Sequence, residues 1–163
     1  EIVGNELAMQ KKINFSIQLP KDESSILPVH SDTWAGDSPF EVVVWIPLVN
    51  ANKTSSMFIL PKYTYREKKF TKINFKNNEQ IRSKFKKDFK FINIKYGEIL
   101  IFNQSLPHGN DVNMEKNTRV SFNCRFKSLF SPYDQKKLIE FFNPLNLKPA
   151  TLDGINYNEP NFN

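Results

Sequence analysis

Apolar and polar residues alternate along several short segments of the chain, a pattern typical of half-buried β-strands. The alternating segments are residues 13–19, 89–95 and 118–126. Residues 41–46 and 56–60 are instead nearly continuous runs of apolar residues, rich in β-branched side chains in the first case, and predict strands buried on both faces. Residues 99–102 follow the turn residues Tyr96-Gly97-Glu98 and predict a further strand.

Helical periodicity is confined to two segments, Glu79 to Phe85 and Asp134 to Phe142. In the second segment Asp134 can cap the first turn, while Leu138, Phe141 and Phe142 form an apolar stripe. Ten prolines punctuate the chain, which suits short strands joined by turns. The pattern therefore predicts an all-β fold, a sandwich or jelly roll with a few short flanking helices and a ligand in the mouth of the barrel.

The length and composition indicate one globular domain over residues 1–163. Of the 163 residues 39% are hydrophobic and 25% are charged, which excludes a disordered or collagen-like chain. The longest apolar stretch, residues 42–49, is interrupted by Pro47 and falls far short of the ~20 residues that a membrane-spanning helix needs. The chain begins with Glu1 rather than Met, which leaves open an N-terminal portion of the domain upstream of this sequence.

The charge and cysteine content narrow the partners and the compartment. The net charge is +6, but the lysines are scattered along the chain, which favours a solvated basic surface over a nucleic-acid partner. Cys124 is the single cysteine and no Cys-x-x-Cys motif exists, so a reducing compartment, the cytoplasm, is expected. The sequence leaves the oligomeric state open, a homodimer included.

Both histidines of the chain lie in polar, turn-flanked surroundings. His30 and Asp32 stand two residues apart, so in an extended segment their side chains share one face, and His108 follows a predicted strand. Two imidazoles and one carboxylate form a facial triad, which leaves three positions of an octahedral ion such as Fe(II) open. The competing interpretation is two surface histidines near turns, because the His-x-Asp motif is short.

The strand predicted over residues 118–126 carries an unusual polar face. Arg119, Ser121, Asn123 and Arg125 alternate with apolar residues and therefore point to one side. Arginine is suited to clamping a carboxylate with two hydrogen bonds in a partly dry pocket, so this face predicts a bound anion. The alternative is that both arginines face solvent and only the apolar face packs.

These motifs, in this order and spacing, resemble the Fe(II)/2-oxoglutarate-dependent oxygenases. The segments that carry the resemblance are His30-x-Asp32, residues 42–48, residues 56–61, residues 97–102, His108-Gly109-Asn110 and Arg119, eleven residues beyond His108. The resemblance covers roughly residues 28–128 and is nearest to the phytanoyl-CoA-hydroxylase-like branch, within it to StrG-like oxygenases of carbohydrate and aminoglycoside biosynthesis. It implies a cupin-like double-stranded β-helix with iron at its open end.

The resemblance also implies the roles of individual residues. His30, Asp32 and His108 would be the catalytic iron ligands, and Arg119 would bind the distal carboxylate of 2-oxoglutarate. Arg125 lies on the same face and would either assist Arg119 or meet an anion of the substrate. Asn103 follows the strand that leads to His108, where it either orients a ligand or the oxo acid through hydrogen bonds or forms a turn.

The implied reaction is the oxidation of a small polar metabolite, a sugar or an aminoglycoside-type precursor, by O₂. It is coupled to the decarboxylation of 2-oxoglutarate to succinate. A cupin-like metal-dependent isomerase or dioxygenase would share the fold, although such enzymes usually spend more histidines on the metal. A sugar-binding jelly roll without enzymatic activity would bind no metal at all.

Overall fold

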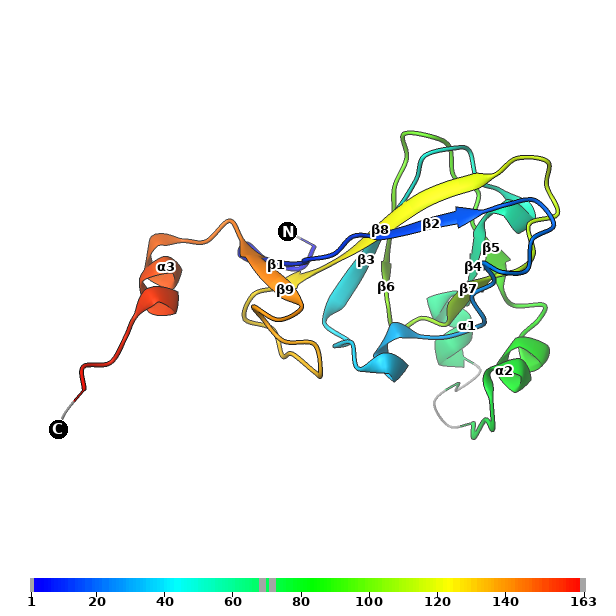
Figure 1. Cartoon of the computed structure of the whole chain (residues 1–163). Helices are drawn as coiled ribbons and strands as arrows, with labels where there is room; N and C mark the ends of the chain where they lie inside the picture. Colours follow the sequence, from blue (N-terminus) through cyan, green and yellow to red (C-terminus); the bar gives the residue numbers. More distant parts are fainter. Residues whose placement is uncertain (1, 68–69, 71–72, 162–163) are drawn as a thin grey trace.

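Two antiparallel β-sheets form the body of the protein, in a computed structural model that describes residues 2–67, 70 and 73–161 (Figure 1). The larger sheet has the strand order β6-β3-β8-β1-β9, with β2 also paired to β8, and the smaller sheet has the order β5-β4-β7. The strands of the larger sheet are β1 (Leu7–Gln10), β2 (Asn14–Gln18), β3 (Glu41–Pro47), β6 (Leu100–Asn103), β8 (Arg119–Ser128) and β9 (Phe142–Leu145). Those of the smaller sheet are β4 (Met57–Ile59), β5 (Lys90–Phe91) and β7 (His108–Asn110).

The helices of the protein are short. The α-helices are α1 (Lys62–Glu67), α2 (Asn78–Lys84) and α3 (Pro149–Asn156), and the 3-10 helices are η1 (Asp32–Ala35) and η2 (Lys53–Ser55). Helices α1 and α2 lie near the smaller sheet, whereas α3 lies apart from both sheets near the C-terminus (Figure 1). None of the helices in the described part of the chain could span a bilayer.

The two sheets face each other across a hydrophobic core, which confirms the predicted mainly β jelly-roll fold. Val43 and Trp45 of β3 and Phe102 of β6 pack against Met57 and Ile59 of β4, and all five are buried. A second cluster, around the fully buried Phe58 and Phe85, fills the space between the smaller sheet and α2. Packing of apolar faces across two sheets is the dominant stabilising contribution in such folds.

The predicted strands are found close to their expected positions. Strands β2, β3, β4, β6 and β8 each lie within or overlap a predicted segment. Residues 89–95 form only the two-residue strand β5, and β1, β7 and β9 were not predicted. The alternate residues of β3 are partly exposed, so this strand is fully buried on one face only.

Strand β2 exposes its apolar side chains and buries a polar one, the reverse of the usual amphipathic strand. Phe15 and Ile17 are 62% and 49% exposed, while Gln18 of the opposite face is fully buried. The cause lies in the neighbouring strand, because Ser16 pairs with Ser121 and Gln18 pairs with Arg119 on the polar face of β8. The polar face of β2 therefore points into the molecule.

This orientation predicts unequal effects for two phenylalanine substitutions. Phe58→Ala removes a fully packed ring and should lower the free energy of unfolding by about 3–5 kcal/mol. Phe15→Ala removes a ring that is 62% exposed and should change it by less than about 0.5 kcal/mol. Urea denaturation of both variants measures the difference, and effects of similar size would mean that the apolar face of β2 is covered.

The helix predicted over Asp134 to Phe142 is wrong. Ile139 has a positive φ of 68°, and its amide donates to the carbonyl of Phe142 across a tight turn. Phe142 then begins β9 and pairs with Gln10 of β1, where its side chain is fully buried. Pairing with β1 decides the conformation here, because a strand partner distant in sequence cannot be read from local periodicity. The helix predicted over Glu79 to Phe85 is confirmed as α2.

Candidate metal centre and cofactor pocket

The two histidines face each other across a pair of backbone hydrogen bonds. The amide of His30 donates to the carbonyl of His108 at 2.9 Å, and the amide of His108 donates to that of His30 at 2.8 Å. Residues directly opposite in an antiparallel pair place their side chains on the same side. The two imidazole rings therefore lie with their centroids 4.3 Å apart.

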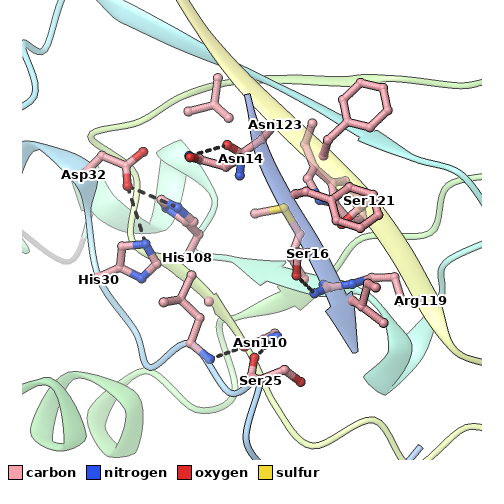
Figure 2. A pocket seen from close by; sticks show the side chains of 18 of the residues that line it. Asn14, Ser16, Ser25, His30, Asp32, His108, Asn110, Arg119, Ser121 and Asn123 are labelled. Carbon is pink, nitrogen blue, oxygen red and sulfur yellow. Dashed lines mark hydrogen bonds and ion pairs between the residues drawn. The ribbon is translucent and has the colours of Figure 1, made fainter. Parts of the chain in front are cut away.

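Asp32 completes a group of three converging side chains. It begins the 3-10 helix η1, and its amide donates to the carbonyl of Gln104 at 3.2 Å. Its Oδ1 lies 3.5 Å from Nε2 of His30 and 3.9 Å from Nε2 of His108. The three ligand atoms lie within 4.8 Å of one another, so the structure brings together all three metal ligands predicted from the sequence (Figure 2).

Hydrogen bonds at the far side of each ring orient both imidazoles. Nδ1 of His30 lies 2.8 Å from the carbonyl of Pro28, and Nδ1 of His108 lies 2.9 Å from that of Leu106. A backbone carbonyl can only accept, so each Nδ1 carries a proton, and Nε2 is the nitrogen that becomes free for a ligand in the neutral form of each ring. Histidines that ligate metals are usually held in this way.

The surroundings of Asp32 and His108 favour their metal-binding forms at neutral pH. Burial raises the pKa of Asp32, but the hydrogen bond from His30 and the charge of Arg125 outweigh it and hold this pKa at about 2. Burial and the neighbouring His30 lower the pKa of His108 to about 4. Burial lowers the pKa of His30, yet its contacts with Asp32 and Pro28 raise it overall above the ordinary value. Asp32 is therefore ionised and His108 neutral, as metal ligation requires.

The three residues line a cavity of about 610 Å³ between the sheets. The polar face of β8 forms one wall, where Arg119, Ser121, Asn123 and Arg125 all line the cavity, as the alternation along this strand predicts. Strand β2 adds Asn14 and Ser16, and Nδ2 of Asn14 donates to Oδ1 of Asn123 at 3.0 Å (Figure 2). The cavity is thus polar on the side that faces the candidate metal ligands.

Arg119 is a buried cation with hydrogen-bonding capacity to spare. It is 4% exposed, and burial lowers its pKa to about 10. Its Nη2 donates to Oγ of Ser16 at 3.0 Å, but its Nε has no hydrogen-bond partner among the described residues. The buried Oγ of Ser121, two residues further along β8, lacks one as well within the same part of the chain. A buried guanidinium beside a free hydroxyl suits a carboxylate ligand.

Sequence comparisons identify no relatives: no family model matches the chain, and no curated protein is similar to it in sequence. Solved structures do match. The non-haem monooxygenase ThoJ in complex with nickel is 15% identical with a TM-score of 0.56, over 80% of this chain and 48% of ThoJ. The α-ketoglutarate-dependent carbocyclase SnoK from nogalamycin biosynthesis is 13% identical with a TM-score of 0.55, over 78% of this chain and 52% of SnoK.

A third match was solved with ligands bound. HygX from Streptomyces hygroscopicus, with nickel, 2-oxoglutarate and hygromycin B, is 12% identical with a TM-score of 0.53. That match covers 83% of this chain and 61% of HygX. The chain shares the fold of these three proteins. It spans about half the length of ThoJ and SnoK.

The position of Asn103 bears on the two roles that the sequence left open for it, a contact with a ligand or the oxo acid and a turn. It is exposed and lies outside the cavity lining, where its side chain donates to the carbonyl of Pro39 and accepts from the amide of Ser105. This geometry favours the turn-forming alternative over a contact with the cofactor. The next residue, Gln104, is fully buried and its Oε1 accepts from Nε of Arg125 at 3.2 Å.

The sequence contained a signal that Gln104 faces inward, but none for the contact between Gln10 and Arg125. Gln104 stands two residues after the buried Phe102, so the alternation of β6, continued past its last residue, indicates an inward side chain. Gln10 accepts from both the amide and Nη1 of Arg125 at 3.2 Å, although 115 residues separate them. No local pattern links these two residues, because strand pairing alone brings them together.

Proposed function

We propose that this chain carries the catalytic centre of a non-haem Fe(II)/2-oxoglutarate-dependent oxygenase. One observation carries the proposal: the Nε2 atoms of His30 and His108, whose Nδ1 atoms are bonded to backbone carbonyls, converge with Asp32 on a cavity whose wall also holds Arg119. A metal site alone would not need the arginine, and an anion site alone would not need the triad. Both features share one cavity, and the fold is that of known enzymes of this class.

The donor set fits Fe(II). Two imidazoles and one carboxylate form the facial triad of non-haem iron oxygenases, which leaves open positions for a bidentate cosubstrate. A structural zinc site would need four protein ligands, and the buried Cys124 is absent from the cavity lining. His30, Asp32 and His108 would therefore hold the iron and serve as the catalytic residues.

The anion-binding wall fits 2-oxoglutarate. Arg119 would pair with its distal carboxylate, and the free Oγ of Ser121 would donate to the same group. Arg119 and Arg125 are six residues apart on β8, roughly 20 Å at the usual rise of a strand, so they serve different parts of the cavity. Arg119 is therefore proposed as the carboxylate-binding residue, and Arg125 is not.

The bound Fe(II), 2-oxoglutarate and O₂ would supply the oxidising chemistry, with succinate and CO₂ as the products of the cosubstrate. The protein contributes binding, orientation and shielding. His30 and His108 would offer Nε2 as a ligand atom from rings held at Nδ1, Asp32 stays ionised, and Arg119 would bind the cosubstrate. A cavity of about 610 Å³ is larger than 2-oxoglutarate alone requires and leaves room for a small substrate.

We propose a neutral polyhydroxylated substrate, such as a sugar derivative, rather than a polycationic aminoglycoside. Apart from the triad and the arginines, the polar groups of the lining are amides and hydroxyls, including those of Asn14, Ser24 and Asn110. Among the described residues of the lining, Asp32 is the one carboxylate, and the metal would take its charge. Decarboxylation of 2-oxoglutarate should therefore be stimulated by neutral glycosides, and stronger stimulation by aminoglycosides would contradict this proposal.

An anaerobic titration with Fe(II) and 2-oxoglutarate tests the proposed function. We expect the weak visible charge-transfer band that a 2-oxo acid gives when it chelates Fe(II), and we expect the band to be lost in His108→Ala. A sugar-binding jelly roll would bind no metal, and a cupin-like isomerase would bind metal without responding to 2-oxoglutarate. Absence of the band in the wild type, or its persistence in His108→Ala, would reject the oxygenase.

The remaining expectations from the sequence stay predictions. A cytoplasmic location rests on the lone Cys124, whose thiol is buried. A homodimer remains one of the open oligomeric states, and a single oxygenase domain over residues 1–163 stays a proposal, supported by the packing of both sheets on one core cluster.

A further inference from the structure

Arg125 lines the cavity, but its guanidinium group is committed to protein partners. Its Nη2 lies 3.0 Å from Oδ2 of Asp32, and its Nε donates to Oε1 of Gln104 at 3.2 Å. Its Nη1 donates to Oε1 of Gln10 at 3.2 Å, and Oδ1 of Asp37 lies 3.4 Å from Nε. Gln104, Gln10 and Asp37 thus hold the guanidinium group, which also contacts the candidate metal ligand Asp32.

We propose that Arg125 is a positioning residue of the metal centre, which anchors Oδ2 of Asp32 so that Oδ1 faces the two histidines. On this view Arg125 binds neither 2-oxoglutarate nor the substrate. The inference rests on the proposed function, because it assumes that Asp32 ligates a metal. It also resolves an alternative that the sequence left open, namely whether Arg125 meets the cosubstrate or a substrate anion.

The geometry around Asp32 separates the roles of its two oxygens. Oδ1 is the atom nearest to both histidine Nε2 atoms, whereas Oδ2 is the atom paired with Arg125. An ionised carboxylate rotates readily about its last bond unless both oxygens are engaged. The hydrogen-bonding guanidinium therefore fixes the direction in which Asp32 presents its ligand atom.

Buried side chains hold Arg125 in turn. Gln104 is fully buried, and its Nε2 donates to Oε2 of Glu41 at 2.8 Å and to the carbonyl of Ser38 at 2.7 Å. These two acceptors fix the amide so that Oε1 points at Arg125. The carbonyl of Gln104 also accepts from the amide of Asp32, so one residue supports the metal ligand through both its backbone and its side chain.

Gln10 also holds Arg125, at a break in the strand pairing of the larger sheet. Strand β2 pairs with β8 as far as Asn123 and β1 pairs with it from Phe126, so neither strand offers a backbone acceptor to the amide of Arg125. Oε1 of Gln10, at the end of β1, accepts from this amide and from Nη1 of the same residue. At this break Gln10 therefore holds both the backbone and the side chain of Arg125.

Arg119, on the same strand, has an unused hydrogen-bond donor, unlike Arg125. Its Nε lacks a hydrogen-bond partner in the described residues. The one carboxylate among the described residues of the cavity lining is Asp32, which pairs with Arg125 instead. Arg119 therefore has donors for an incoming carboxylate, whereas those of Arg125 are in use. This contrast provides the matched control for a test.

The test compares Arg125→Met with Arg119→Met by two binding measurements that need no turnover. The first is the affinity for Fe(II), titrated anaerobically. The second is the ratio of the affinities for 2-oxoglutarate and 2-oxobutanoate at saturating Fe(II), read from the charge-transfer band. Because 2-oxobutanoate lacks the distal carboxylate, this ratio reports only the residue that binds that group.

We expect Arg125→Met to weaken Fe(II) binding by about 10-fold or more, as is usual when a partner of a metal ligand is removed. The affinity ratio should stay within about 3-fold of the wild type, since Arg119 is intact, whereas Arg119→Met should abolish the preference for 2-oxoglutarate and leave Fe(II) binding unchanged. A collapsed ratio in Arg125→Met, or unaltered Fe(II) affinity, would overturn the proposal.

Two further variants keep the test decisive if Arg125→Met does not fold. Arg125→Lys retains the charge but cannot bond to Asp32, Gln104 and Gln10 together, so it should restore Fe(II) affinity only in part. Gln104→Leu frees Nε of Arg125 and should weaken Fe(II) binding with the ratio retained. A wild type that binds no Fe(II) would instead refute the proposed function itself, which separates the two failures.

Discussion

Replacing Asp32 by alanine is expected to weaken Fe(II) binding by more than about 100-fold, since loss of an outer partner alone typically costs 10–100-fold. The variant keeps only two ligand nitrogens, and it also leaves Arg125 facing the site without the carboxylate that lies 3.0 Å away. A partly buried cation next to a divalent ion repels it, so both effects act in the same direction. Anaerobic Fe(II) titration measures the change.

A matched control for this experiment is Asp153→Ala. Asp153 is an exposed carboxylate of α3, which lies apart from the sheets (Figure 1). Its removal changes the net charge of the protein by the same amount and should leave Fe(II) affinity unchanged. Asp32→Ala with an affinity within about 3-fold of the wild type would show that the three side chains do not share an ion.

Arg119→Met is expected to weaken 2-oxoglutarate binding by about 30-fold or more, which corresponds to about 2 kcal/mol for a truncated buried charge pair. Arg119→Lys should recover little of the loss, because an ammonium group cannot reproduce the two parallel hydrogen bonds of a guanidinium group. The loss should appear in the dissociation constant measured at saturating Fe(II). Wild-type affinity in Arg119→Met would place the distal carboxylate elsewhere in the cavity.

The same substitution should have the opposite effect on the ligand-free protein. Arg119 is 4% exposed, and burying a cation without an anionic partner costs free energy. An apolar methionine removes that cost, so the midpoint of thermal unfolding without ligands should rise by about 2–4 °C for each kcal/mol recovered. A lower midpoint would show that the hydrogen bond to Ser16 contributes more than the buried charge costs.

Taken together, the two arginines of β8 illustrate how one strand can serve two purposes. Both were predicted from alternation to face the same cavity, and both line it. Only their partners distinguish them, since Arg125 is held by Asp32, Gln104 and Gln10 while Nε of Arg119 has no partner in the described residues. The sequence therefore predicted that both arginines face the cavity, but not which of them has a hydrogen-bond donor free for a ligand.

Local patterns located most strands correctly because alternation reflects the two faces of a pleated strand. They failed where a distant segment decides the conformation. Residues 134–142 have helical spacing, yet Phe142 is drawn into β9 by pairing with β1, and the turn at Ile139 precedes it. The exposed apolar face of β2 has the same origin, because its polar face must meet that of β8.

The sequence by itself determined which residues could form a facial triad. The chain has two histidines, and one carboxylate lies two residues from the first, so residue types and spacing made His30, Asp32 and His108 the candidate ligands. Tertiary structure alone decided how these groups are held: the tautomer of each imidazole, the oxygen of Asp32 that faces them, and which arginine remains free. Each of these depends on hydrogen bonds between residues far apart in sequence, which only the pairing of strands across the sheets brings together.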